Sequence, residues 1–95
     1  MQFEWDDQKE KANIAKHHID FATAALVFKD RNRLEWYDAA HSLTEDRYVT
    51  IGMINDVAFI VTVVYTERHD RIRLISARKA TKQERRKYDD RAQGN

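Results

Sequence analysis

The chain has 95 residues and a formal net charge of +1; 42% of its residues are hydrophobic and 35% are charged. A chain of this length supports one hydrophobic core, so we expect a single domain over residues 1–95. It contains no cysteine, no signal-peptide pattern and no apolar run near the ~18 residues that a membrane helix needs. A disulfide scaffold is therefore excluded, and the composition predicts a cytoplasmic protein without membrane contact.

The charges are distributed unevenly. Residues 1–66 carry 7 Lys and Arg against 11 Asp and Glu, whereas residues 67–95 carry 10 against 5. Most cations of the second segment are arginines, whose planar guanidinium suits bidentate contacts with phosphate. This segment indicates a phosphate-bearing partner. The alternative, for the arginines near the C-terminus, is an ordinary solvated helix face.

The N-terminal part predicts a short strand and two helices. Residues 3–5 alternate apolar and polar, as an edge strand does, and either aspartate that follows offers an N-cap for a helix ending near Lys16. Asp20 caps a second helix over residues 21–28. Its apolar residues recur at i, i+3, i+4 and i+7, so this helix should pack on a sheet.

The remainder predicts four strands and a final helix. Residues 57–65 are uncharged and mostly β-branched or aromatic, which is typical of a strand buried on both faces in the middle of a sheet. Residues 34–37 form one further strand, and residues 47–54 and 71–76 form two more. We expect hairpin turns at Asn55-Asp56 and at His69-Asp70. A capping box, Thr81 with Glu84, opens a helix that ends near residue 91.

This order of elements predicts an α+β fold, an antiparallel sheet with two N-terminal helices and one C-terminal helix. Arg71 and Arg73 should lie on one face of the last strand, because the alternating Ile72 and Leu74 belong to the core. The large aromatic residues are expected in the core as well: they are Trp5, Phe21, Phe28, Trp36 and Phe59.

Several motifs occur together in this chain. They are F-E-W-D at residues 3–6, then Lys9, Asn13, Lys16-His17, Phe21, Val27-Phe28 and Asp30; Asp38, His41-Ser42, Glu45 and Arg47; V-V-Y-T-E-R at residues 63–68; and I-R-L-I-S-A-R-K-A-T at residues 72–81, followed by Glu84 and Tyr88. With these motifs the chain resembles the BrnT family, the ribonuclease toxins of type II toxin–antitoxin pairs. The resemblance covers residues 3–88.

The resemblance implies a fold similar to RelE, cleavage of RNA and arrest of translation. It also implies neutralisation by a BrnA-like antitoxin, a ribbon-helix-helix protein. The pair typically assembles as a heterotetramer that represses its own promoter, so DNA contact would come only through the antitoxin. One residue departs from the family: glycine usually follows the Lys-His pair, where this chain has His18. If the backbone there is left-handed, histidine costs roughly 1 kcal/mol.

Metal-independent cleavage of RNA needs a base, an acid and cations around the phosphorane. His41 and Glu45, four residues apart in one loop, are the candidate bases; alternatively Glu45 pairs with Arg47 and His41 is simply exposed. Arg73 and Arg78 are the candidate cations, and the alternative for Arg73 is a structural pair with Glu67 or Glu84. Tyr88 is a candidate acid, or a ring that packs on the sheet.

Further contacts with RNA are expected from cations elsewhere in the chain; the alternative for these residues is an ordinary solvated surface. These are Lys9 and His17, which share a helix face, and Arg47 and Arg68. The four histidines show no metal-ligand spacing and the chain has no glycine-rich phosphate loop, so we expect neither a metal nor another cofactor. Two rival functions remain open: a non-catalytic RNA- or protein-binding module, and an inactive toxin kept as a co-repressor subunit.

Overall fold

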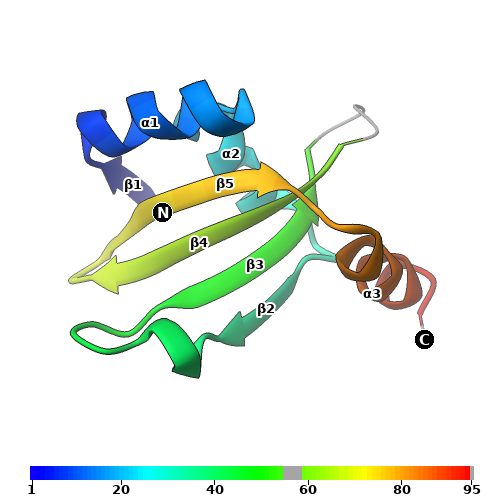
Figure 1. Ribbon diagram of the computed structural model, residues 1–95. Coiled ribbons are helices and arrows are strands. Elements are labelled where there is room, and N and C mark those ends of the chain that lie inside the picture. Colours follow the sequence, from blue (N-terminus) through cyan, green and yellow to red (C-terminus); the bar gives the residue numbers. More distant parts are fainter. Residues whose placement is uncertain (55–58, 95) are drawn as a thin grey trace.

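The computed structural model describes residues 1–54 and 59–94. The elements are β1 (Gln2–Trp5), α1 (Asp7–His17), α2 (Phe21–Ala24), the 3-10 helix η1 (Ala25–Lys29), β2 (Leu34–Tyr37), the 3-10 helix η2 (Ala39–His41), β3 (Tyr48–Met53), β4 (Ile60–Arg68), β5 (Arg71–Lys79) and α3 (Lys82–Ala92). The described strands form one sheet in the order β1-β5-β4-β3-β2, with α1 and α2 beside β5 and α3 at one end (Figure 1). The α+β class is thus confirmed. Within the described ranges, no helix is both long and apolar enough to cross a membrane.

The sheet is mixed, so the expectation of a purely antiparallel sheet was wrong. The strands β2 to β5 pair antiparallel, but β1 runs parallel to β5, with Phe3 opposite Ile72. Most of the chain separates β1 from β5, so no tight hairpin dictates the direction of their pairing. β1 is nevertheless an edge strand, as predicted, because it adds to the outer side of β5.

The predicted central strand is confirmed as β4, the third of five strands. Val61, Val63 and Tyr65 are buried, and the strand continues to Arg68. The residues before Phe59 in the predicted strand, and the predicted turn at Asn55-Asp56, lie outside the described residues. The predicted turn at His69-Asp70 is confirmed, because Arg68 pairs with Arg71 across it.

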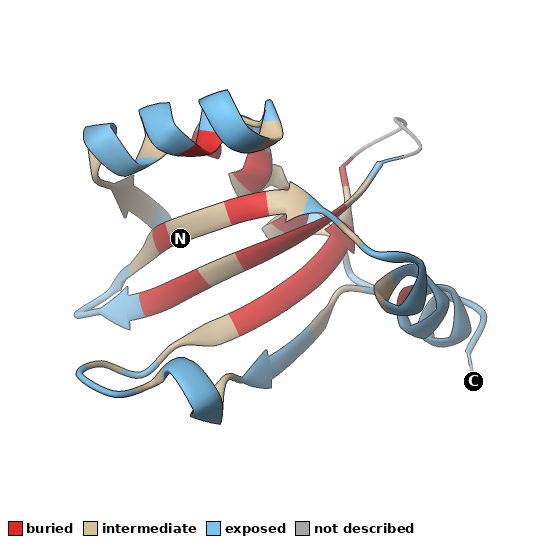
Figure 2. Ribbon diagram, in the orientation of Figure 1, coloured by how far each residue is buried: buried red, intermediate tan, exposed pale blue. Residues whose placement is uncertain are grey.

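One face of the sheet, which we call the helix-covered face, carries the main core. Phe21, Ala24 and Val27 of α2 and η1 pack against Val61, Val63, Leu74 and Ala77 of β4 and β5, and the buried residues run along the middle strands in Figure 2. β3 contributes Gly52 at a point of close approach. A Cβ atom there would lie 2.8 Å from Val27 Cγ1, which explains the glycine.

The aromatic residues are divided between the core and the surface. Trp5 and Phe28 pack against the core as expected, with the Trp5 and Phe21 rings 6.0 Å apart. The prediction was wrong for Trp36 and Phe59, which are 39% and 46% exposed. Trp36 pairs with Val49 on the face of the sheet opposite the main core, a side that alternation within a four-residue strand does not reveal.

The local helix signals are confirmed in detail. The Asp6 side chain accepts hydrogen bonds from the first turn of α1, and Thr81 with Glu84 forms the predicted capping box of α3. The second predicted helix begins after Asp20, but only its first four residues are α-helical and the rest is the 3-10 helix η1. His18 closes α1 in the left-handed conformation, with φ 61°.

Asn13 joins α1 to β5 beyond the end of β1. Its side-chain amide donates to the Ala77 carbonyl at 2.9 Å, and its carbonyl oxygen accepts from the Ala77 N–H at 3.0 Å. The amide also donates to the Ile19 carbonyl at 2.9 Å. Asn13 is buried and thus replaces the neighbouring strand that β5 lacks at this position, satisfying both backbone groups of Ala77.

We expect Asn13→Ala to lower the free energy of unfolding by about 2 kcal/mol, because it leaves buried backbone groups without partners. Urea unfolding followed by circular dichroism measures this. Lys16→Ala, on the exposed part of the same helix, is the control and should change the value by less than about 0.5 kcal/mol. Equal stability of the two variants would contradict the bridging role of Asn13.

We expect His18→Gly to raise the free energy of unfolding by about 0.5–1 kcal/mol, because glycine adopts φ 61° without a Cβ clash. His17→Gly is the matched control: residue 17 ends the helix proper, so glycine there should be destabilising. Thermal and urea unfolding of both variants and of the wild type measure these changes in the free energy of unfolding. A His18→Gly protein less stable than the wild type would show that the left-handed residue carries no strain.

Candidate nucleic-acid-processing groove

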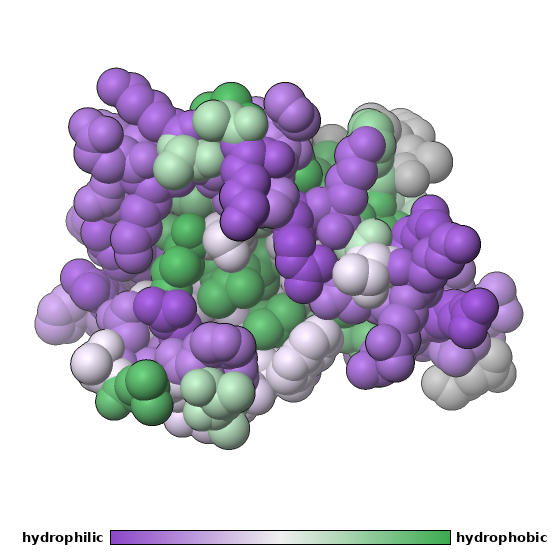
Figure 3. Space-filling model, in the orientation of Figure 1, coloured by the Kyte–Doolittle hydropathy of each residue, from purple (hydrophilic) through white to green (hydrophobic). Residues whose placement is uncertain are grey.

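The open face of the sheet, opposite the helix-covered face, contains a groove of about 280 Å³. Val49, Val64 and Ile75 form its apolar floor. The polar and aromatic lining residues come from β2, from η2 and the loop residues on either side of it, from β5 and from α3; they are Trp36, Asp38, His41, Arg47, Ser76, Arg78 and Glu84. Figure 3 shows apolar side chains at the centre of this view, bordered by hydrophilic ones. We call this feature the central groove.

His41 stands at one wall of the groove, at the end of η2. Its Nδ1 lies 2.9 Å from Oδ2 of Asp38, and its side chain is 70% exposed. An ionised carboxylate only accepts hydrogen bonds, so in this geometry Nδ1 carries the proton and donates it to Asp38. In the neutral ring the Nε2 lone pair is then free to accept a proton from a bound molecule.

The loop that carries His41 is tied at its base to the start of β3. The Asp38 N–H donates to the Arg47 carbonyl at 2.8 Å. Ser42 Oγ donates to the Asp38 carbonyl at 2.6 Å and accepts from the Arg47 N–H at 2.9 Å. These bonds close residues 38–47 into a loop that holds His41 and Arg47 at the same groove. Within the described ranges no ion pair involves Arg47.

Arg78 and Glu84 form the wall where α3 meets the sheet. Arg78 Nη1 and Nη2 donate to the two carboxylate oxygens of Glu84 at 2.7 and 3.0 Å. Oε1 of Glu84 also accepts from the Thr62 hydroxyl at 3.0 Å and the Thr81 N–H at 2.9 Å. The hydrogen bond from Arg78 outweighs the effect of burial and lowers the pKa of Glu84 to about 2. Glu84 is therefore an anion at neutral pH and no proton donor.

Three further predicted site residues, Glu45, Arg68 and Arg73, lie on or near this face but not in the groove. Arg73 Nη1 donates to Glu4 Oε2 at 2.9 Å, and this bond lowers the pKa of Glu4. Arg68 Nη2 donates to Glu45 Oε2 at 3.2 Å. The structure thus pairs each arginine with a carboxylate, although the partners differ from those weighed in the sequence. None of these four side chains lines the groove.

The remaining predicted residues lie elsewhere. Tyr88 is 3% exposed and its hydroxyl donates to Asp30. Burial first, and then this hydrogen bond, raises the pKa of Tyr88 above its usual range. Lys9 and His17 lie on α1, which packs beside β5. The structure therefore brings together His41, Arg47 and Arg78, and not the other candidates.

Four polar or aromatic groove residues were missed as site residues: Trp36, Asp38, Ser76 and Glu84. Trp36 was placed in the core by its hydrophobicity, whereas Asp38 and Glu84 were noted only as motif and capping positions. The spacing of Asp38 and His41 could have identified Asp38 as the partner of the histidine, because side chains at i and i+3 meet in one helical turn.

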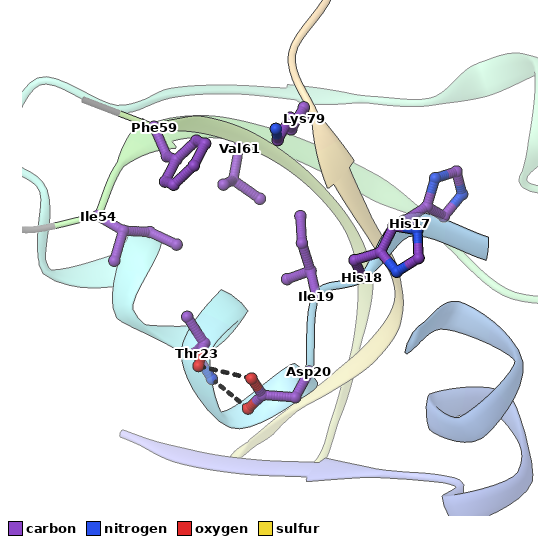
Figure 4. Close-up of a pocket in the computed structure, with 9 residues that line it drawn as sticks. All are labelled: His17, His18, Ile19, Asp20, Thr23, Ile54, Phe59, Val61 and Lys79. Atoms are coloured by element: carbon purple, nitrogen blue, oxygen red, sulfur yellow. Dashed lines mark hydrogen bonds between the residues drawn. The ribbon is translucent and has the colours of Figure 1, made fainter. Parts of the chain in front are cut away.

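A second pocket, of about 460 Å³, opens between the end of α1, α2 and the start of β4. Ile19, Ile54, Phe59 and Val61 form its apolar walls, with His17 and His18 at one side (Figure 4). Asp20, the one carboxylate among its described lining residues, is bound by the backbone N–H and hydroxyl of Thr23 at 2.9 and 2.7 Å, as the N-cap of α2. This pocket is larger than the groove, but its described lining includes neither an arginine nor a histidine oriented by a carboxylate, so we place the candidate site in the groove.

A small α+β protein with a histidine and arginines on an open sheet face carries the groups expected of a ribonuclease. Residues 5–84 match the family model described as "Ribonuclease toxin, BrnT, of type II toxin-antitoxin system". The match covers 80 of the 95 residues, so the chain belongs to the BrnT family, and the resemblance seen in the motifs is confirmed. No curated protein matched the chain. A toxin of this type has RNA as its target and an antitoxin as its partner.

Glu84→Gln should lower the free energy of unfolding at pH 7 by about 1–2 kcal/mol, because Arg78 loses an ionised partner. In the wild type, the contribution of Glu84 is complete above its ordinary pKa of 4.5 and is lost as the pH falls toward about 2. The variant should therefore lose less stability between pH 4.5 and 2. Urea unfolding of the wild type and the variant across this pH range measures the difference.

Glu67→Gln, at an exposed carboxylate on β4, is the matched control and should keep most of the wild-type acid dependence. If Glu84→Gln and Glu67→Gln showed the same acid dependence, the pairing of Arg78 with Glu84 would not stabilise the protein.

Proposed function

We propose that this protein is a metal-independent endoribonuclease that cuts RNA in the central groove and so blocks translation in the cytoplasm. The observation that supports it is the convergence of a carboxylate-oriented histidine and two arginines on an open, partly apolar sheet face. The groove supplies a base and cations from side chains alone, which is what cleavage without a metal requires.

In the proposed reaction, His41 is the general base. Asp38 holds the ring with Nε2 available, as an orienting carboxylate does in a catalytic triad. Nε2 takes the proton of a ribose 2′-hydroxyl, the 2′-oxygen attacks the adjacent phosphorus, and the bond to the 5′-oxygen breaks. The products are a 2′,3′-cyclic phosphate and a 5′-hydroxyl end, and solvent at the open groove provides the proton of the latter.

The two groove arginines have different tasks in this proposal. Arg78 is held by two hydrogen bonds from its guanidinium to Glu84, so its position is fixed but its charge is partly offset. Arg47 has no ion pair within the described residues and keeps its full charge. We therefore assign Arg47 the larger share of phosphorane stabilisation and Arg78 the orientation of the phosphate.

The other predicted residues receive supporting roles. Tyr88 and Asp30 lock α3 to the end of β3, because Asp30 Oδ2 also accepts from the Met53 N–H at 2.7 Å. We propose no proton transfer for Tyr88 or Glu45. Arg68 and Arg73 are proposed to contact the RNA backbone outside the groove; Lys9 and His17, on α1, would contribute only to long-range attraction.

We propose a RelE-like mode of action and a BrnA-like ribbon-helix-helix antitoxin that neutralises the protein by covering the groove. The pair would form a heterotetramer and reach DNA only through the antitoxin. Charge complementarity with His41, Arg47 and the basic residues 67–95 predicts an acidic segment on the antitoxin. Because the charge of Arg78 is partly offset by Glu84, this arginine favours one rival function, a module that binds RNA without cutting it.

His41→Ala should lower the rate of RNA cleavage by about 10²- to 10⁴-fold, the usual loss for a general base, and leave RNA affinity nearly unchanged. Arg47→Ala should lower the rate about 10²-fold and weaken binding as well. Cleavage of labelled single-stranded RNA in EDTA, and of messenger RNA in a translating cell extract, is followed on gels. Filter binding provides the affinity.

His69→Asn is the matched control for the histidine, because asparagine tolerates the positive φ of residue 69. Lys11→Ala is the control for Arg47→Ala, because it removes a cation from α1, outside the groove. Both should cut RNA at the wild-type rate. If the wild type cut neither naked nor translated RNA but retained it on filters, the binding module would be correct.

A further inference from the structure

Trp36 lines the central groove and is only partly buried. It faces the open side of the edge strand β2, is 39% exposed and lines the groove beside Asp38 and His41. Its neighbours on the strand face the other way: Glu35 accepts from the Tyr65 hydroxyl, and Tyr37 packs edge-on against Tyr48. Within the described residues no aromatic ring pairs with Trp36.

The surroundings of Trp36 are complementary to both parts of a nucleotide, the flat base and the charged phosphate. An indole next to the apolar floor of Val49, Val64 and Ile75 suits the flat face of a nucleobase, which stacks on aromatic rings. His41, Arg47 and Arg78, in the same groove, suit the phosphate attached to that base. An apolar protein segment would contact the floor but would leave Arg47, which has no ion pair within the described residues, without an anion.

We propose that Trp36 is the base-stacking subsite of this groove, holding an unpaired nucleobase next to the phosphate at which the RNA is cut. This proposal rests on the proposed function and adds the substrate class, single-stranded RNA. In a duplex the base faces are already stacked on their neighbours, so they cannot reach the indole without unpairing.

The chain has two tryptophans, which makes the test direct. In Trp5→Phe, a substitution on the opposite face of the sheet, Trp36 is the only indole and reports its own contacts. We expect a single-stranded 2′-O-methyl RNA oligonucleotide, which lacks the attacking hydroxyl, to quench this fluorescence. The same oligonucleotide in a duplex should cause little quenching.

Substitutions at residue 36 distinguish aromatic stacking on a base from a non-specific apolar contact. Trp36→Phe should bind the oligonucleotide within a few-fold of the wild type, whereas Trp36→Leu should bind about 5- to 100-fold more weakly, the effect of losing one base stack. Thermal unfolding checks that each variant remains folded. Trp5→Phe, without a substitution at residue 36, should bind as the wild type does.

The outcomes distinguish this proposal from the nuclease function. If the wild type cuts RNA but Trp36→Leu binds and cuts equally well, or Trp36 fluorescence does not respond, stacking is wrong and the nuclease assignment stands. If Trp36 is quenched but no RNA is ever cut, the stacking subsite stands and the nuclease assignment fails. Equal quenching by the duplex would overturn the single-strand preference. A response to the antitoxin alone would assign Trp36 to the protein partner.

Discussion

The carboxylate of Glu84 is the contact on which the shape of the open face depends. It accepts hydrogen bonds from β4 through Thr62, from β5 through Arg78 and from the start of its own helix through Thr81. One anion thus joins two strands to α3 and sets where the helix lies. Thr62, which is opposite Ile51 in the sheet, is fully buried at this end. Because α3 is anchored at this end of the sheet and is short, it borders the central groove through Glu84 without filling it.

The two faces of β4 therefore serve different purposes. Val61 and Val63 are sealed on the helix-covered face by α2 and η1, and this packing provides most of the apolar burial. Val64, on the other face, is only partly covered and forms part of the groove floor. The uncharged central strand was predicted to be buried on both sides, but Phe59 is exposed and Ile60 and Val64 are only partly buried; of these three residues, Val64 lines the groove.

The features that the sequence predicts well are those decided within a few residues. The N-cap at Asp6, the capping box at Thr81 and the turn at His69-Asp70 involve groups that are neighbours in the chain, so their chemistry is visible without a fold. The parallel pairing of β1, the exposure of Trp36 and the bond from Arg73 to Glu4 depend on segments far apart. Glu4 and Arg73 are 69 residues apart, and only the parallel register of β1 and β5 makes them partners.

This long-range pairing also changes what the charge distribution means. The basic C-terminal segment indicated a phosphate-bearing partner, but the fold places carboxylates of the acidic N-terminal segment next to its arginines. Glu4 faces Arg73 and Glu45 faces Arg68, while Glu84 engages Arg78 from within the basic segment. Arg47, from the acidic half of the chain, is the groove arginine that keeps its full charge. The cation best placed to act on a phosphate therefore comes from the segment whose net charge is negative, which explains why composition alone pointed to other residues.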